Sequence, residues 1–207
     1  MADGKTYLEK LGKAYENCDF KDRWDYLLQI ANGIAEADKQ MLLKEYPEFP
    51  KSLMEILEKI DGTYYRKYGD ETILYYFFGS DVSDGEYPYY LFSAQDIIEN
   101  KDSAENFADL FYYFLNEPDE DYGPFVDERI QTDASKLKWL NFSDCMNNGG
   151  TSKLYIDFTP SEKGTKGQII RYLHDPDELQ VIADSFDDFL DMLIENDFAF
   201  IHEDDFD

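Results

Sequence analysis

The sequence predicts a single α+β domain: a mainly antiparallel sheet of about six strands with helices packed on it. Three observations predict it. Helical periodicity runs through roughly the first 60 residues, two sets of short aromatic and β-branched segments follow, and an amphipathic helix pattern comes near the end. Turn-forming residues separate segments within each set, which indicates hairpins. Helices and hairpin-joined strands in this order are typical of an antiparallel sheet with helices on it.

Apolar residues recur at helical spacing in the amino-terminal third of the chain. The helical segments are 8–15 and 20–28 (one or two helices), about 34–46, and about 50–60. Pro47 ends the third, because proline lacks the amide hydrogen that a helix needs. Pro50 opens the fourth, and Gly62 is expected as its C-cap.

From Thr63 the pattern changes to that of strands. The predicted strands are 63–68, 72–78 and 87–92. Eleven of the 30 residues from 63 to 92 are aromatic, and the run Tyr75–Phe78 is expected to place rings on both faces of the sheet. One face is core. The other is either covered by a helix or exposed as a partner-binding patch.

Two more helices are predicted between the strand sets. Ser93 caps a short helix to Asn100, with Asp96 in a capping-box position. A second helix, about 103–115, carries an apolar stripe made of Phe107, Leu110, Phe111 and Phe114. Residues 125–138 show no clear periodicity.

The second strand set begins at Trp139. Its members are 139–142, 152–158, 168–174 and 180–183. In the second of them, Leu154, Ile156 and Phe158 alternate toward one face. Ser185 is expected to cap the last helix, with acidic residues in its favourable first turn.

The formal net charge is −27, and two blocks carry almost all of it. Residues 70–128 hold 16 acids against one base, and residues 175–207 hold 13 acids and no base, whereas residues 1–69 have a net charge of −2. Such a field repels nucleic acid and anionic membranes and attracts a basic protein. The alternative is a solvated face that confers solubility.

No motif indicates catalysis, a metal or a cofactor. His174 and His202 have no histidine or cysteine at ligand spacing, and nucleophile elbows, phosphate loops and calcium loops are missing. We therefore predict a protein that is not an enzyme. Cys18 and Cys145 are expected to be reduced thiols. Without an apolar leader or an apolar stretch of spanning length, a cytoplasmic location is expected.

The segment from Gly33 to Tyr65 resembles the opening signature of the SUKH superfamily, whose fungal branch includes cell-wall synthesis regulators. The matching residues are Tyr46, Pro47, Phe49, Pro50, Leu53, Leu57, Asp61 and Gly62. Later segments at 89–93, 139–142, 154–157, 167–170 and 185–190 resemble the family's remaining strands and helix. An insert of about 40 residues, near 99–138, departs from the usual pattern.

The resemblance implies a SUKH-like α+β domain at 31–198, a helical extension at 1–30 and an acidic tail at 199–207. It also implies a binding function. Bacterial members resemble immunity proteins that neutralise a toxin, often a nuclease with a basic cleft; the alternative is an intracellular regulatory scaffold like the fungal members. The residues expected to contact a basic partner are Asp81, Asp84, Glu86, Glu117, Asp119, Glu120, Asp121 and Tyr122.

Overall fold

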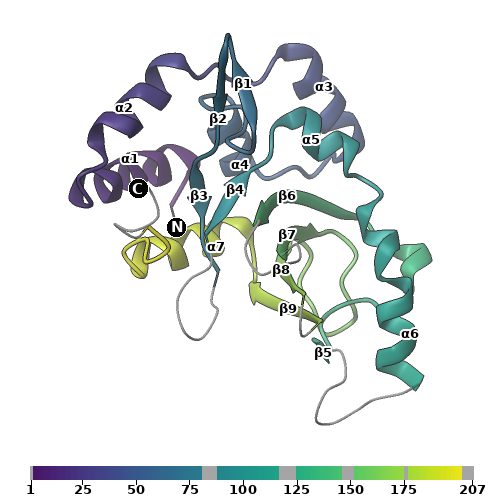
Figure 1. The fold of residues 1–207 in the computed structure, drawn as a ribbon. Helices are drawn as coiled ribbons and strands as arrows, with labels where there is room; N and C mark the ends of the chain where they lie inside the picture. The colour runs from purple at the N-terminus through teal and green to yellow at the C-terminus, as the bar shows by residue number, and fades with distance from the viewer. Residues whose placement is uncertain (1, 81–87, 117–124, 146–151, 175–176, 202–207) are drawn as a thin grey trace.

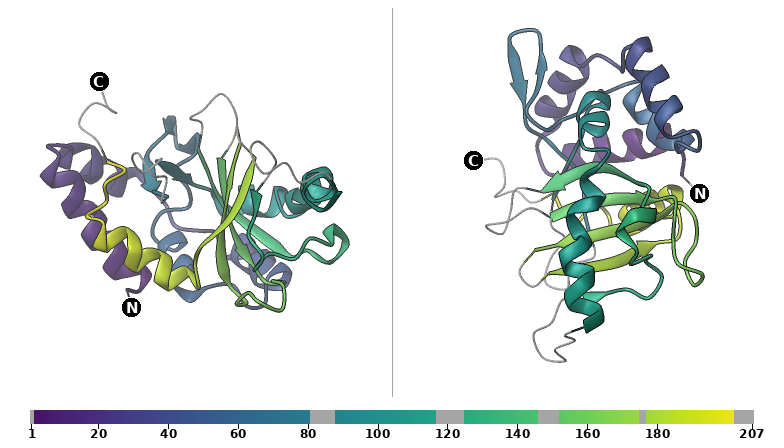
Figure 2. Two further views of the ribbon diagram at one scale, coloured as in Figure 1. Left: turned by 90° about the horizontal axis from the view of Figure 1, so that it is seen from below. Right: turned by 90° about the vertical axis from the view of Figure 1, so that its right-hand side faces the viewer.

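A computed structural model describes residues 2–80, 88–116, 125–145, 152–174 and 177–201. In these residues a seven-stranded sheet lies between two helical layers, and a two-stranded hairpin projects from one end (Figures 1 and 2). The predicted α+β architecture is confirmed. No helix in the described part of the chain is both long and apolar enough to cross a membrane.

The described helices are α1 (Gly4–Asn17), α2 (Lys21–Ile30), α3 (Glu36–Glu45), α4 (Lys51–Leu57), α5 (Ala94–Glu99), the 3₁₀ turn η1 (Ser103–Phe107), α6 (Ala108–Asn116), the 3₁₀ turn η2 (Ala134–Lys136) and α7 (Phe186–Glu195). The described strands are β1 (Arg66–Tyr68), β2 (Glu71–Ile73), β3 (Tyr76–Phe78), β4 (Tyr89–Leu91), β5 (Phe125–Val126), β6 (Trp139–Cys145), β7 (Ser152–Asp157), β8 (Gln168–Leu173) and β9 (Glu178–Ala183).

The strand order is β3-β4-β6-β7-β8-β9-β5. Neighbouring strands are antiparallel, except that β5 pairs in parallel with β9. Strands β6 to β9 pair in sequence order, each antiparallel to the next, as the spacing of the predicted strands indicates. The hairpin β1–β2 forms its own small sheet.

The larger apolar core lies on the face of the sheet that α1, α4 and α7 cover (Figure 2). The predicted alternation in β7 is confirmed, because Leu154 and Ile156 enter this core together with Phe158 at its edge. Tyr7 of α1 packs on Phe78, and its hydroxyl donates a hydrogen bond to the carbonyl of Phe77 (2.5 Å). The first helix is therefore fixed to the sheet.

The opposite face carries a smaller core, which η1 and α6 close. Phe107 lies in its middle, with ring centroids 5.6 Å from Trp139, 5.8 Å from Tyr155 and 4.8 Å from Tyr172. Phe111 packs edge-on against Trp139. The predicted stripe on the segment 103–115 is thus confirmed, although its first turn is 3₁₀ and not α.

The Asp61–Gly62 turn of the opening signature contacts the start of helix α5. Helix α4 ends at Leu57 with Glu58 as its C-cap, so the expectation that Gly62 caps it is wrong. Gly62 has φ +95°, and a Cβ there would lie 2.7 Å from the amide nitrogen of Ser93. Asp61 accepts hydrogen bonds from Ala94 N (2.8 Å) and Arg66 (2.6 Å). A glycine is needed because the turn approaches the start of α5 closely.

One predicted strand also differs from the structure. The segment 72–78 divides into β2 and β3, because β2 turns back on β1 and only β3 enters the large sheet. A register shift between Tyr76 and Phe78 breaks the expected alternation, so Phe77 and Phe78 both enter the larger core. Strand pairing, and not local preference, decides which way these rings point.

Both predicted serine caps are present. The Ser93 hydroxyl accepts a hydrogen bond from Asp96 N while Asp96 accepts one from Ser93 N, which completes a capping box. The Ser185 hydroxyl accepts from Asp188 N at the start of α7. Each bond satisfies an amide that the first helical turn leaves without a partner.

Candidate functional site

The eight residues expected to contact a partner all fall outside the described residues. Asp81, Asp84 and Glu86 lie between Ser80 and Pro88, and Glu117, Asp119, Glu120, Asp121 and Tyr122 lie between Asn116 and Phe125. Their placement therefore stays a prediction. The structure does describe the two elements that flank the second segment in sequence, helix α6 before it and strand β5 after it.

Helix α6 and strand β5 expose several large apolar side chains. Tyr112, Tyr113 and Leu115 of α6 have exposed fractions of 58%, 51% and 60%, and Phe125 of β5 is 52% exposed. We call these four residues the insert surface, because all lie in the predicted insert. Helix α6 contacts β5, and the rings of Tyr112 and Tyr113 are edge to face at 5.8 Å. Tyrosine exposed in a group is typical of protein-binding surfaces.

The insert surface lies in an acidic stretch of the chain. From residue 102 to residue 128 the sequence has nine carboxylates and no lysine, arginine or histidine. Asp102, Glu105 and Asp109 are exposed in the part of this stretch that the structure describes. Aromatic rings beside carboxylates can accept cationic side chains, through charge and through cation–π contact.

Two buried carboxylates, Asp157 and Asp144, lie on the face of the sheet that η1 and α6 cover. Burial raises the pKa of Asp157 to about 6, although hydrogen bonds from Thr159 N (2.8 Å) and Gln168 Nε2 (2.9 Å) act to lower it. Burial also raises the pKa of Asp144 to about 6, with Lys153 Nζ 3.9 Å away. Asp157 pairs with Trp139, five residues before Asp144 on the same strand. The two carboxyls therefore lie roughly 13–17 Å apart, too far for an acid–base pair.

The described residues contain no group of three or more potential metal ligands. His174 Nδ1 lies 2.9 Å from Asp177 Oδ1, which also accepts a hydrogen bond from the Tyr172 hydroxyl. His174 is therefore part of a local hydrogen-bond network with Tyr172 and Asp177. Cys18 and Cys145 do not form a disulfide with each other.

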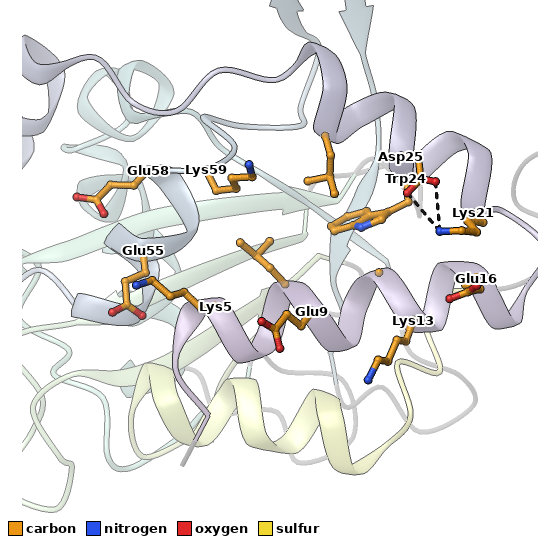
Figure 3. A pocket seen from close by; sticks show the side chains of 13 residues that line it. Lys5, Glu9, Lys13, Glu16, Lys21, Trp24, Asp25, Glu55, Glu58 and Lys59 are labelled. Carbon is orange, nitrogen blue, oxygen red and sulfur yellow. Dashed lines mark hydrogen bonds and ion pairs between the residues drawn. The ribbon is translucent and has the colours of Figure 1, made fainter.

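A second candidate surface is a groove between α1, α2 and the end of α4 (Figure 3). Its cavity volume is about 590 Å³, and its apolar floor is formed by Leu8, Trp24 and Leu28. Trp24 stacks on Tyr15 with centroids 5.4 Å apart and lies against Gly12, where a Cβ would be 2.5 Å from the indole nitrogen. The missing side chain at Gly12 thus seats the indole beside α1.

Charged side chains form the rim of the groove. Lys21 pairs with Asp25 (3.2 Å), Lys51 with Glu55 (3.1 Å), and Lys39 with Glu58. On the side of α1 that lines the groove the charges alternate: Lys5, Glu9, Lys13 and Glu16 follow one another, as Figure 3 shows. All four are exposed, and within the described residues none lies within ion-pair distance of an opposite charge.

The sequence contained part of the signal for both surfaces. On α6 the inner stripe was predicted, and Tyr112, Tyr113 and Leu115 are the apolar residues that fall outside it. On α1, the helical spacing of Leu8 with Leu11 and Tyr15 predicts that all three lie in the core. Only Leu11 and Tyr15 are fully buried. The groove was missed because it requires the α1–α2 packing at Gly12, which no local pattern specifies.

Comparison with protein families identifies the fold family. The family model described as the SMI1 / KNR4 family (SUKH-1) matches residues 18–192. The match includes α2 through most of α7 and leaves out α1. A search of curated proteins gave no match. The family match spans most of the 207 residues, and the chain belongs to the SMI1/KNR4 (SUKH-1) family.

Proposed function

We propose that this chain is a non-catalytic immunity protein, which neutralises a cognate toxin by direct binding through the insert surface. The observation that carries the proposal is the exposure of Tyr112, Tyr113, Leu115 and Phe125 in a stretch with nine carboxylates and no base. Membership of the SMI1/KNR4 (SUKH-1) family supports a binding role in general, without specifying the partner. The acidity of the stretch favours a basic toxin, such as a nuclease whose cleft normally receives phosphates.

The rings and the charges have separate roles in the proposed interface. Exposed tyrosines are stiff side chains that lose little entropy on binding and cover a large area, so they suit the centre of an interface. Carboxylates around them raise the rate of encounter with a basic surface. In this proposal Glu117, Asp119, Glu120, Asp121 and Tyr122 extend the surface, and Asp81, Asp84 and Glu86 form a second contact.

The test is binding of the full chain to the toxin domain encoded beside its gene, measured by calorimetry and by association kinetics. Tyr112→Ala with Tyr113→Ala is expected to weaken binding about 30-fold or more, since paired anchors each contribute above 1 kcal/mol. Tyr26→Ala, which removes a 42% exposed tyrosine from α2, is the matched control and is expected to leave binding unchanged. Equal binding by the double variant and the control would remove the insert surface from the proposal.

The charges are tested separately. Neutralising the acidic segment with Glu117→Gln, Asp119→Asn, Glu120→Gln and Asp121→Asn is expected to slow association about tenfold at low ionic strength. The difference from the parent chain is expected to shrink as salt is added. A parent association rate that does not respond to salt would contradict a basic partner.

A regulatory scaffold, like the fungal members for which the family is named, is the second candidate. It rests on the resemblance of the sequence to the SUKH superfamily, whose fungal branch includes cell-wall synthesis regulators. A toxin gene beside this one and protection of cells by the chain favour the immunity role. Failure to protect cells, together with capture of endogenous regulatory proteins by the insert surface, would favour the scaffold.

A further inference from the structure

The row of charges on α1 complements itself. Read from the amino end, Lys5, Glu9, Lys13 and Glu16 are positive, negative, positive and negative; read from the carboxyl end, the signs are reversed. Along the helix, the point midway between Lys5 and Glu16 lies within half a residue of the point midway between Glu9 and Lys13. Two copies of α1 placed antiparallel about that point would therefore set Lys5 against Glu16 and Glu9 against Lys13, each twice.

We propose that a second copy of this chain occupies the groove, with α1 of each copy lying antiparallel to the other. Such a two-fold interface uses the same patch on both subunits and closes without leaving a free copy of the patch. The row spans twelve residues, whose eleven rises give roughly 17 Å of helix, a sufficient length for side-by-side contact. This proposal is independent of the immunity function.

Three features of the groove favour a second copy over other occupants. A purely basic or purely acidic segment would meet two like charges on α1, whereas a second α1 meets none. In the described residues the four α1 charges form no ion pair, although Glu16 helps to raise the pKa of Lys21 and Lys5 helps to lower that of Asp3. The carboxylates on the α2 and α4 sides of the groove are paired with lysines. Leu8, Trp24 and Leu28 supply an apolar floor between the two charged rims.

The position of α1 also permits the contact. The residues that line the groove lie between Lys5 and Lys59, in a segment whose net charge is −2, whereas α7, which also contacts α1, belongs to the acidic block at 175–207. The insert surface is on the opposite face of the sheet from α1 (Figure 2). Helix α1 precedes the family match, which begins at residue 18, whereas α2 and α4 lie within it.

The first experiment measures self-association of the full chain by sedimentation velocity over a wide concentration range. The average mass is expected to rise toward twice the chain mass. Lys5→Glu with Lys13→Glu makes all four charges negative and is expected to weaken association about tenfold or more. Lys44→Glu with Lys67→Glu changes the net charge equally at exposed positions outside the row and is expected to weaken it far less.

The decisive variant inverts the whole row: Lys5→Glu, Glu9→Lys, Lys13→Glu and Glu16→Lys. Its net charge equals that of the parent and its row is again self-complementary, so it is expected to self-associate. Mixed with the parent chain, it is expected to form no mixed pairs, because every contact would then join like charges. Energy transfer between labelled chains measures this choice.

Three results would overturn the proposal. The parent chain could stay monomeric at every concentration; Lys5→Glu with Lys13→Glu could associate as well as the parent; or the inverted chain could pair with the parent as readily as with itself. Circular dichroism confirms that each variant is folded. Loss of toxin binding is not among these results, so the two proposals fail separately.

Discussion

The face of the sheet under α1, α4 and α7 differs from the face under η1 and α6 in how many chain segments close it. Three helices from distant parts of the sequence meet on the first face, and their core includes Phe77, Phe78, Phe142 and Phe189. On the second face one continuous segment, inserted between β4 and β6, covers a smaller core around Trp139 and Tyr155.

The first face is needed for the stability of the domain, whereas the second face can vary. A core that joins α1, α4 and α7 cannot open without loss of the whole domain. A segment that leaves the sheet after β4 and returns at β5 can move or change its outer side while the rest stays folded. The second face is therefore where a family member can carry a surface of its own, and in this chain that surface is aromatic and acidic.

The largest expected effect tests this contrast in the two cores. Phe78→Ala is expected to lower the free energy of unfolding by about 3–5 kcal/mol, because it leaves a cavity where Phe78 meets Tyr7, Phe142 and Phe189. Phe111→Ala is expected to cost less, about 2 kcal/mol, since α6 can settle into the space. Urea unfolding measures both losses.

Hydrogen exchange distinguishes the two variants further. Phe111→Ala is expected to speed exchange in α6 and leave β7 and β8 protected, whereas Phe78→Ala is expected to speed exchange throughout the sheet. If Phe111→Ala raised exchange evenly over the whole domain, the second face would be as cooperative as the first, and the contrast would be wrong.

The next effect concerns Asp144, one of the two buried carboxyls on the second face. The pKa of Asp144 is raised by burial to about 6 from 3.8, so the folded chain binds more protons than the unfolded chain between these values. The unfolding free energy contributed by this group therefore falls as pH rises through the window from about 4 to about 6. Asp144→Asn removes that loss.

Asp144→Asn is thus expected to stabilise the chain by about 1–2 kcal/mol at pH 7.5 and by nothing at pH 4. Urea titrations at both pH values measure the difference between variant and parent. Asp70→Asn, at an exposed position, is the control and is expected to show no such dependence. A destabilised variant at pH 7.5 would mean that the pair with Lys153 outweighs the cost of burying the charge.

The smallest expected effect is on the outer side of the second face. Tyr112→Ser with Tyr113→Ser is expected to change the free energy of unfolding by less than about 0.5 kcal/mol, because both rings are more than half exposed. Thermal unfolding measures it. A loss above about 1 kcal/mol would show that the rings hold the domain together, and the insert surface would then not be available for a partner.

Much of the fold could be predicted because its signals are local. The caps Ser93 and Ser185, the inner stripe of α6 and the alternation in β7 depend only on nearby residues and their spacing. The errors fall where distant strands decide. The register shift at Tyr76–Phe78 depends on β4, the two-residue strand β5 exists only because β9 lies beside it, and Gly62 is explained by Ser93, 31 residues away.

The candidate sites divide in the same way. The sequence by itself determined the two acidic blocks, the charge row of α1 and the family, because composition, spacing and motif order are properties of the chain. Only the tertiary structure decided which apolar residues stay uncovered. Tyr112 and Phe125 are exposed while Phe107 and Phe111 are buried, although all are aromatic. Burial depends on what packs opposite a side chain, and the chain brings that partner from elsewhere in the fold.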